Sequence, residues 1–186
     1  MAGVDDLERI AADAAAGDPL AAATLVRATQ SDVWRLCAAL GDRDTADDLT
    51  QETYLRAFGS LHRFEGRSSL RTWLLSIARR VCADAVRSRR RRRLTLVGDD
   101  DELETLSTAV PSRDPVAQGV AVADLLDRLD ADRREAFVLT QFLGLPYAEA
   151  AEVVGCPVGT IRSRVARARA DLVDLLGGAE GAHASG

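Results

Sequence analysis

The side chains most able to do chemistry in this chain are arginines, and they occur in two dense clusters. All 24 basic residues are arginine, and six of the seven residues from 87 to 93 belong to the first cluster. The second cluster is Arg162, Arg164, Arg167 and Arg169, with no acid among them. Guanidinium groups bind phosphates and pair bidentately with guanine. The net charge is −5, but binding to a polyanion depends on local charge, so the clusters predict a nucleic-acid ligand.

The second cluster lies in a segment with the features of a helix-turn-helix unit. Ala150 and Ala151 are small enough for two helices to cross closely, and a turn through Gly155 to Pro157 follows. An apolar stripe then recurs at helical spacing: Ile161, Val165, Ala168 and Leu172. A solvated arginine face would explain the arginines alone. The crossing alanines, the turn and the stripe together favour DNA binding.

The first cluster ends a long amphipathic helix that a polar loop precedes. The loop over residues 62–69 contains Gly66 and two serines, and Ser68 or Ser69 can cap the helix. The helix should begin at Leu70, with apolar residues at three- and four-residue spacing. This stripe includes Trp73, which we expect, like Trp34, in the core.

The elements that position these residues are predicted to be helices throughout. Hydrophobic residues make up 47% of the chain and aromatics 4%, with abundant Ala and Leu and no alternating strand pattern. We expect an all-α protein of two small helical domains joined by a flexible linker. The domain ranges are 1–93 and 119–176, the linker 94–118 and a disordered tail 177–186. Helices are expected over residues 7–16, 19–40, 45–60, 70–93, 120–129, 132–143, 147–154 and 159–176.

Several classes of function find no support in the residue types. The cysteines, Cys37, Cys82 and Cys156, are far apart and should be small buried hydrophobes, and only His62 and His183 could assist them. We therefore expect no metal, no cofactor and no enzymatic activity. No apolar run is long enough to span a bilayer, and the N-terminus lacks a signal-peptide pattern, so the expected location is cytoplasmic.

Three segments resemble the extracytoplasmic-function (ECF) RNA polymerase sigma factors, in particular the actinobacterial sigma-C type. Residues 145–169 are similar to the promoter-recognising helix-turn-helix, especially the run Pro157-Val-Gly-Thr-Ile-Arg-Ser-Arg164. Residues 47–58 look like the helix that binds the polymerase clamp. Residues 71–80, followed by Asp84 and the arginine run, look like the helix at the −10 element. The three matches occur in the family's order.

The resemblance implies which residues contact DNA. The second domain (sigma region 4) would bind the −35 element through Thr160, Arg162, Ser163, Ala166, Arg167 and Arg169. The first domain (sigma region 2) would capture an unpaired −10 base through Arg67, Ser68, Ser69, Arg80, Asp84 and Arg87. Phosphate contacts would come from Arg89, Arg90 and Arg91. Many family members have Asn at the position of Arg80; arginine only donates hydrogen bonds, so the −10 preference is expected to differ.

The resemblance also implies protein partners. Core polymerase, through the clamp of its largest subunit, would bind the polar face of the helix over residues 45–60: Asp47, Asp48, Gln51, Glu52 and Arg56. This face should lie opposite Leu49, Tyr54, Leu55 and Phe58. Many family members are held inactive by an anti-sigma protein. The sequence leaves open whether this chain has such a partner. No membrane partner is expected.

Alternatives remain at two points. A stand-alone helix-turn-helix regulator with a helical sensor or dimerisation domain would bind duplex DNA without polymerase, but it would not need the clamp-like helix. The acidic segment over residues 99–104 could thread through the polymerase or serve only as a soluble tether.

Overall fold

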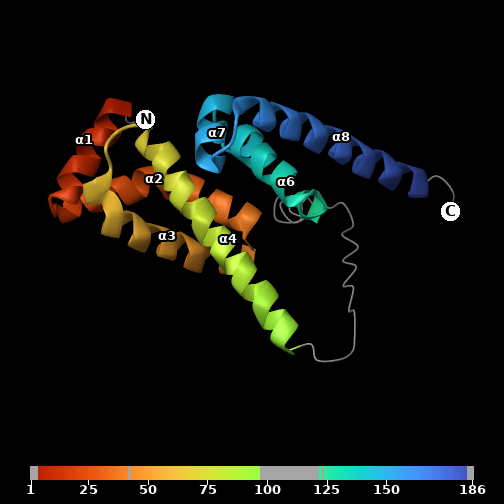
Figure 1. Ribbon diagram of the computed structural model, residues 1–186, viewed down its shortest axis with the longest axis horizontal. Coiled ribbons are helices and arrows are strands. Elements are labelled where there is room, and N and C mark those ends of the chain that lie inside the picture. Colours follow the sequence, from red (N-terminus) through yellow and green to blue (C-terminus); the bar gives the residue numbers. More distant parts are fainter. Residues whose placement is uncertain (1–3, 42, 97–121, 123, 184–186) are drawn as a thin grey trace.

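The computed structural model describes residues 4–41, 43–96, 122 and 124–183, and within these ranges the chain forms helices and no strands. The first half contains α1 (Val4–Ala15), α2 (Pro19–Leu40), α3 (Ala46–Ser60) and α4 (Leu70–Leu96). The second half contains α6 (Ala131–Phe137), α7 (Tyr147–Val154) and α8 (Val158–His183). Short turns η1 (Arg43–Thr45), η2 (Leu61–Arg63) and η3 (Val138–Phe142) lie between them. The all-α expectation is confirmed (Figure 1).

Local capping chemistry sets several helix ends where the sequence predicted them. The Asp18 carboxylate accepts hydrogen bonds from the backbone N–H groups of Leu20 and Ala21 at 2.8 and 3.3 Å, with Pro19 at the first helical position. Ser69 caps α4, because its hydroxyl accepts from the N–H of Thr72 at 3.1 Å. These bonds satisfy N–H groups that would otherwise lack a partner within the helix.

The core of the first half lies where α2, α3 and α4 meet. Its largest fully buried side chains include five leucines, each at most 1% exposed: Leu25, Leu36, Leu70, Leu74 and Leu75. Burial of a leucine side chain contributes roughly 1.5–3 kcal/mol. Because these leucines come from different helices, their burial holds the bundle together and fixes the direction of α4.

The cysteines partly meet expectation. Cys37 on α2 and Cys82 on α4 are buried, as predicted, whereas Cys156 is only half-buried because it lies in the turn between α7 and α8. The Cys82 thiol interacts directly with Cys37, which lowers the pKa of Cys37 and raises that of Cys82. In the described part of the chain, no cluster of His, Cys, Asp or Glu is arranged to hold a metal ion.

The second half departs from a simple helix before the helix-turn-helix. Asp130 caps α6 through the N–H groups of Asp132 and Arg133, but α6 ends at Phe137 instead of continuing to Leu143. A π-helical turn follows, in which the N–H of Leu143 donates to the carbonyl of Val138 at 3.0 Å. This spacing is one residue longer than in an α-helix.

The crossing of α7 and α8 follows the predicted pattern. Ala150 and Ala151 are 0% and 5% exposed, so the helices approach closely where these residues lie. Gly155 has φ +76°, a left-handed conformation that glycine adopts without steric cost. Ile161 and Val165 of α8 are buried beneath the crossing.

Further helix boundaries differ from expectation. α1 begins at Val4, three residues before the predicted start. α4 continues to Leu96, so the first three residues of the expected linker are helical; residues 97–118 lie outside the described ones. α8 continues to His183 instead of ending near Leu176 in a disordered tail.

The two halves pack directly against each other, a contact that the sequence did not predict. α4 lies against α7, and α2 contacts α6 and η3, while α8 extends away from the first half (Figure 1). The Thr72 hydroxyl donates to Glu149 at 2.9 Å, and Arg71 donates to the carbonyl of Leu143 at 2.6 Å. None of the helices in the described ranges is long and apolar enough to cross a membrane.

Candidate nucleic-acid interface

The outer face of α8 is the first candidate surface. Three residues of its apolar stripe are buried as predicted, since Ile161, Val165 and Ala168 are at most 1% exposed, whereas the fourth, Leu172, is half-buried. The residues expected at DNA face outward and are exposed apart from half-buried Thr160: Thr160, Arg162, Ser163, Ala166, Arg167 and Arg169. This arrangement leaves a basic ridge along one side of the helix.

The polar side chains of this ridge are not equally free to bind a ligand. Arg169 donates to the side-chain oxygen of Gln141 at 2.8 Å, and the Ser163 hydroxyl donates to the carbonyl of Thr160 at 2.9 Å. Arg164, at the side of the helix, is held by Asp132. Arg162 and Arg167 make no ion pair with any residue that the structure describes. They are therefore the guanidinium groups most ready for a ligand.

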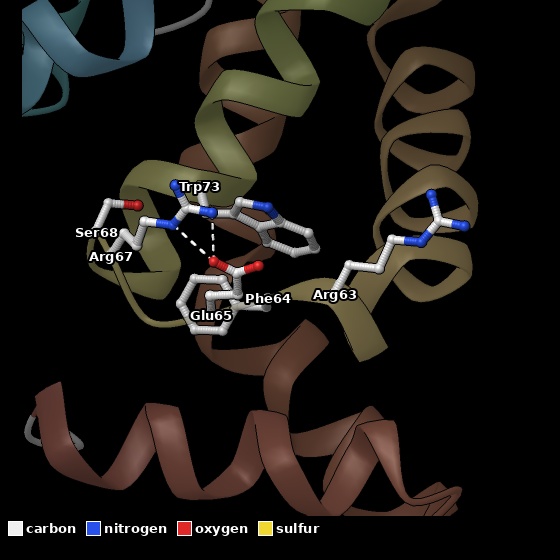
Figure 2. A pocket seen from close by; sticks show the side chains of 6 residues that line it. All are labelled: Arg63, Phe64, Glu65, Arg67, Ser68 and Trp73. Atoms are coloured by element: carbon white, nitrogen blue, oxygen red, sulfur yellow. Dashed lines mark hydrogen bonds and ion pairs between the residues drawn. The ribbon is translucent and has the colours of Figure 1, made fainter.

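A pocket opens beside the start of α4 and is the second candidate surface. It has a volume of about 200 Å³ and is lined by side chains of the loop and of the first turn of α4: Arg63, Phe64, Glu65, Arg67, Ser68 and Trp73 (Figure 2). The Phe64 and Trp73 rings lie 5.3 Å apart, with 52° between their planes. The pocket thus combines aromatic surface with charged and hydroxyl groups.

The two tryptophans meet the core expectation only in part, since Trp34 and Trp73 both pack against the core but are half-buried. Trp73 contacts the core on one side, and its indole lines the pocket. Its position in the apolar stripe of α4 suggested a core residue. That signal was ambiguous, because an aromatic ring at the end of a stripe can serve both as core and as binding surface.

The residues predicted for the −10 element fall into two groups. Arg67 and Ser68 line the pocket, whereas Ser69 caps α4. Arg80, Asp84 and Arg87, which the resemblance also assigned to the −10 element, do not line the pocket. The reason is helix length. At about 1.5 Å per residue, Arg80 lies roughly 10 Å beyond Trp73 along α4, and Asp84 lies roughly 16 Å beyond it.

Asp84 instead joins two of the predicted sites. Its carboxylate accepts from Arg56 of α3 at 2.9 Å and from Arg87, one turn along α4, at 2.5 Å. Arg56 also binds Glu52 at 2.7 Å. The hydrogen bond from Arg56, followed by that from Arg87, lowers the pKa of Asp84. Asp84 therefore organises arginines and is not itself positioned in the pocket.

The arginine run forms the last turns of α4, and part of it is tied back to the bundle. Arg89 donates to the hydroxyl of Thr45 at 2.6 Å, which links α4 to the start of α3. Arg90 and Arg91 are both exposed on this end of the helix. The guanidinium of Arg92 donates to the hydroxyl of Ser88 at 3.4 Å. The run thus presents closely spaced positive charge along one helix end.

The exposed side of α3 differs from expectation. Leu49 and Tyr54 are buried, but Leu55 and Phe58 are 64% and 36% exposed instead of facing inward. Leu55 lies four residues after Gln51, so the two share the outer face of the helix. The predicted polar surface therefore also contains apolar side chains, and these are residues that the sequence analysis assigned wrongly.

Both halves of the chain match known protein families. Residues 25–92 match sigma-70 region 2, and residues 119–172 match sigma-70 region 4. The ECF RNA polymerase sigma factor SigC of Mycobacterium tuberculosis is 52% identical over 86% of this chain and 85% of its own length. The factor EcfG of Rhodopseudomonas palustris is 40% identical over 73% of this chain and 74% of its own.

Solved structures of similar proteins have the same helical architecture. CnrH, in complex with the cytosolic domain of CnrY, superposes with a TM-score of 0.71 at 30% identity, over 92% of this chain and 97% of that chain. RpoE of Bartonella quintana, in complex with the anti-sigma factor NepR, superposes with a TM-score of 0.67 at 32% identity, over 81% of this chain and 93% of that chain.

Proposed function

The chain belongs to the ECF group of RNA polymerase sigma factors, and from this premise we propose how its two halves recognise a promoter. The α8 ridge binds the −35 element as duplex DNA, and the pocket beside α4 captures an unpaired base of the −10 element. Core RNA polymerase supplies the catalysis, and this chain supplies the sequence preference.

The observation that carries the proposal is the state of Arg162 and Arg167. Both are exposed on α8, and neither is neutralised by an acid of the described chain. Arg164, on the same helix, is neutralised by Asp132. Unpaired guanidinium groups on the second helix of a helix-turn-helix suit guanine edges in the major groove. Ser163 and Ala166 lie between them, with room for close approach.

The pocket supports the −10 part of the proposal. An unpaired base must be stacked and hydrogen-bonded by its edge. Trp73 and Phe64 offer aromatic surface, and base stacking on such rings is worth about 1–3 kcal/mol per base. Ser68 can donate or accept at the rim. Arg80, further along α4, would meet the strand beyond the captured base.

The arginine-rich end of α4 would follow the phosphates that lead away from the pocket. Arg87, Arg89, Arg90 and Arg91 lie within little more than one turn of α4, and phosphate contacts add affinity without sequence information. Because Asp84 pairs with Arg87, it would orient the Arg87 side chain towards the phosphates of the DNA backbone.

The exposed side of α3 is the proposed site for the clamp of the largest polymerase subunit. Apolar side chains within a polar surface are typical of protein interfaces. Leu55 and Phe58 would be covered, while Asp48 and Gln51 would form the polar rim. Because similar sigma factors are described in complexes with CnrY and NepR, an anti-sigma protein is a further candidate partner.

Transcription in vitro tests the proposal. Purified core polymerase is given a promoter library with and without this protein, and transcript starts are sequenced. Promoter-specific starts that require both components are expected. If the protein bound duplex DNA alone and gave no core-dependent starts, a stand-alone helix-turn-helix regulator would replace the proposed function.

A further inference from the structure

The pocket beside α4 contains one carboxylate among its cationic and aromatic side chains. Arg67 Nε donates to Glu65 Oε2 at 2.7 Å, and Arg67 Nη2 is paired with the same oxygen (Figure 2). The other oxygen, Oε1, has no hydrogen-bond partner among the residues that the structure describes. Glu65 therefore enters the pocket anchored at one oxygen and available at the other.

The loop backbone accounts for this pairing. Gly66 separates the two residues and has φ +68°, the left-handed conformation of a tight turn. The turn brings the side chains of Glu65 and Arg67 together. They are 63% and 83% exposed, so an incoming ligand can reach both. Arg67 thereby acts as a positioning residue for the carboxylate.

A carboxylate can only accept hydrogen bonds, so it distinguishes bases by their donors. Adenine, cytosine and guanine each have an exocyclic amino group. Thymine has none, and its single N–H lies between two carbonyl oxygens, whose lone pairs would face the carboxylate. Thymine would therefore lose the charge-assisted hydrogen bond and place carbonyl lone pairs against the carboxylate, whereas a base with an amino group would gain that bond.

The size of the pocket limits the ligand to a single ring system. The volume of about 200 Å³ is below the roughly 300–1,000 Å³ of pockets for drug-sized ligands. Trp73 and Phe64 provide the stacking surface, and Glu65 lies at the edge of the space that they bound (Figure 2).

We propose that Glu65 is a specificity-determining residue, which accepts a hydrogen bond from the exocyclic amino group of the captured base and rejects thymine. The inference rests on the proposed function, because it assumes that the pocket holds an unpaired −10 base.

The test uses holoenzyme assembled from core polymerase and the full chain, with forked promoter DNA whose −10 strand is single-stranded. Each −10 base is replaced in turn by its analogue without the amino group: purine for adenine, 2-pyrimidinone for cytosine and hypoxanthine for guanine. Binding is compared for the wild type, Glu65→Ala and a matched control, Glu8→Ala, at an exposed acid of α1.

At one position, removal of the amino group should weaken wild-type and Glu8→Ala binding about tenfold or more, the value expected of a charged hydrogen bond. The same change should affect Glu65→Ala less than about twofold. Glu65→Gln should bind thymine better at that position than the wild type does, because a carboxamide also donates.

Equal penalties in the wild type and Glu65→Ala at every position would overturn the inference and leave Glu65 as the partner that shapes the loop. Equal wild-type binding of thymine and cytosine at the captured position would overturn it too. A wild-type holoenzyme that bound no forked template better than core polymerase alone would instead overturn the proposed function.

Discussion

Arg79 on α4 binds Glu135 on α6 through two hydrogen bonds and so joins the two halves of the molecule. Nε donates to Oε1 at 2.5 Å and Nη2 to Oε2 at 3.2 Å, and Glu135 is only 8% exposed. Two-point contact of this kind fixes orientation as well as distance. The helix proposed to hold a −10 base is therefore fixed in orientation against the half that carries the α8 ridge.

Replacement of Glu135 by alanine should loosen the contact between the halves. Arg79 would lose its charged partner in a half-buried position, and breaking such a contact costs roughly 1–3 kcal/mol. We expect a larger radius of gyration by small-angle X-ray scattering. The exchanged pair Arg79→Glu with Glu135→Arg should recover a compact particle. An unchanged radius in the single variant would mean that the apolar contacts between α4 and α7 suffice.

Substitution of Arg162 or Arg167 by alanine should weaken −35 binding by about 1–3 kcal/mol and relax base preference at the contacted position. The reason is loss of a guanidinium group that no acid of the described chain neutralises. Holoenzyme affinity on wild-type and scrambled −35 DNA measures the effect. Arg128→Ala, at an exposed arginine outside α8, is the control. Equal losses on both DNAs would assign these arginines to phosphate alone.

Charge reversal of Asp48 and Glu52 to lysine should weaken binding to core polymerase at least tenfold, which is about 1.4 kcal/mol. Glu52 also binds Arg56, so part of the loss would come from a displaced arginine. Surface plasmon resonance with immobilised core polymerase is the measurement, and Asp13→Lys on α1 is the control. Unchanged affinity, together with a folded chain by circular dichroism, would remove the clamp assignment.

The carboxylate of Asp84 should titrate below the ordinary aspartate pKa of about 3.9. Arg56 and then Arg87 hold it ionised, which lowers its pKa in the folded chain. Its contribution to stability is therefore present above the unfolded-state pKa and is lost as the pH falls through the folded-state pKa. An NMR titration of the side-chain carboxyl checks the shift. In Arg56→Ala the pKa should rise towards its usual value; the same low pKa in this variant would contradict the assigned cause.

Gly155→Ala should destabilise the second half by about 1–2 kcal/mol. A Cβ at this position meets nothing within 4 Å, so the cost is the left-handed backbone at φ +76° and not a collision. Denaturant unfolding measures the loss. Gly155→Asn should cost less, because asparagine tolerates this conformation. Equal destabilisation by Ala and Asn would point to a steric cause instead.

Several features followed from local sequence because short-range physics determines them. Asp18 and Pro19 predicted the start of α2, and Tyr147–Val154 was placed without error, since caps and apolar periodicity act within one or two turns. The π turn after Phe137 was not predicted. One extra residue in a helix leaves almost no trace in periodicity, whereas the burial of Leu143 and Leu145 depends on it.

The candidate sites show the same division at the level of residues. The outward ridge of α8 was predicted because the buried face of a helix fixes the opposite one. Trp73 and Phe58 were assigned to the inside, because the sequence shows that a residue is apolar but not whether a neighbouring helix covers it. Glu65 was passed over, since its significance depends on Arg67 lying across a left-handed glycine.

By itself, the sequence determined the all-helical fold, the helix-turn-helix and the family of the chain. These depend on patterns within single segments, such as Pro157 to Arg164. Only the tertiary structure decided which charged side chains are paired within the chain and which are exposed for a ligand. It paired Asp84 with Arg56, Arg79 with Glu135 and Glu65 with Arg67, and it left Arg162 and Arg167 exposed. The physical reason is that an ion pair needs atoms within about 4 Å, and residues as far apart as 79 and 135 come this close only when helices pack.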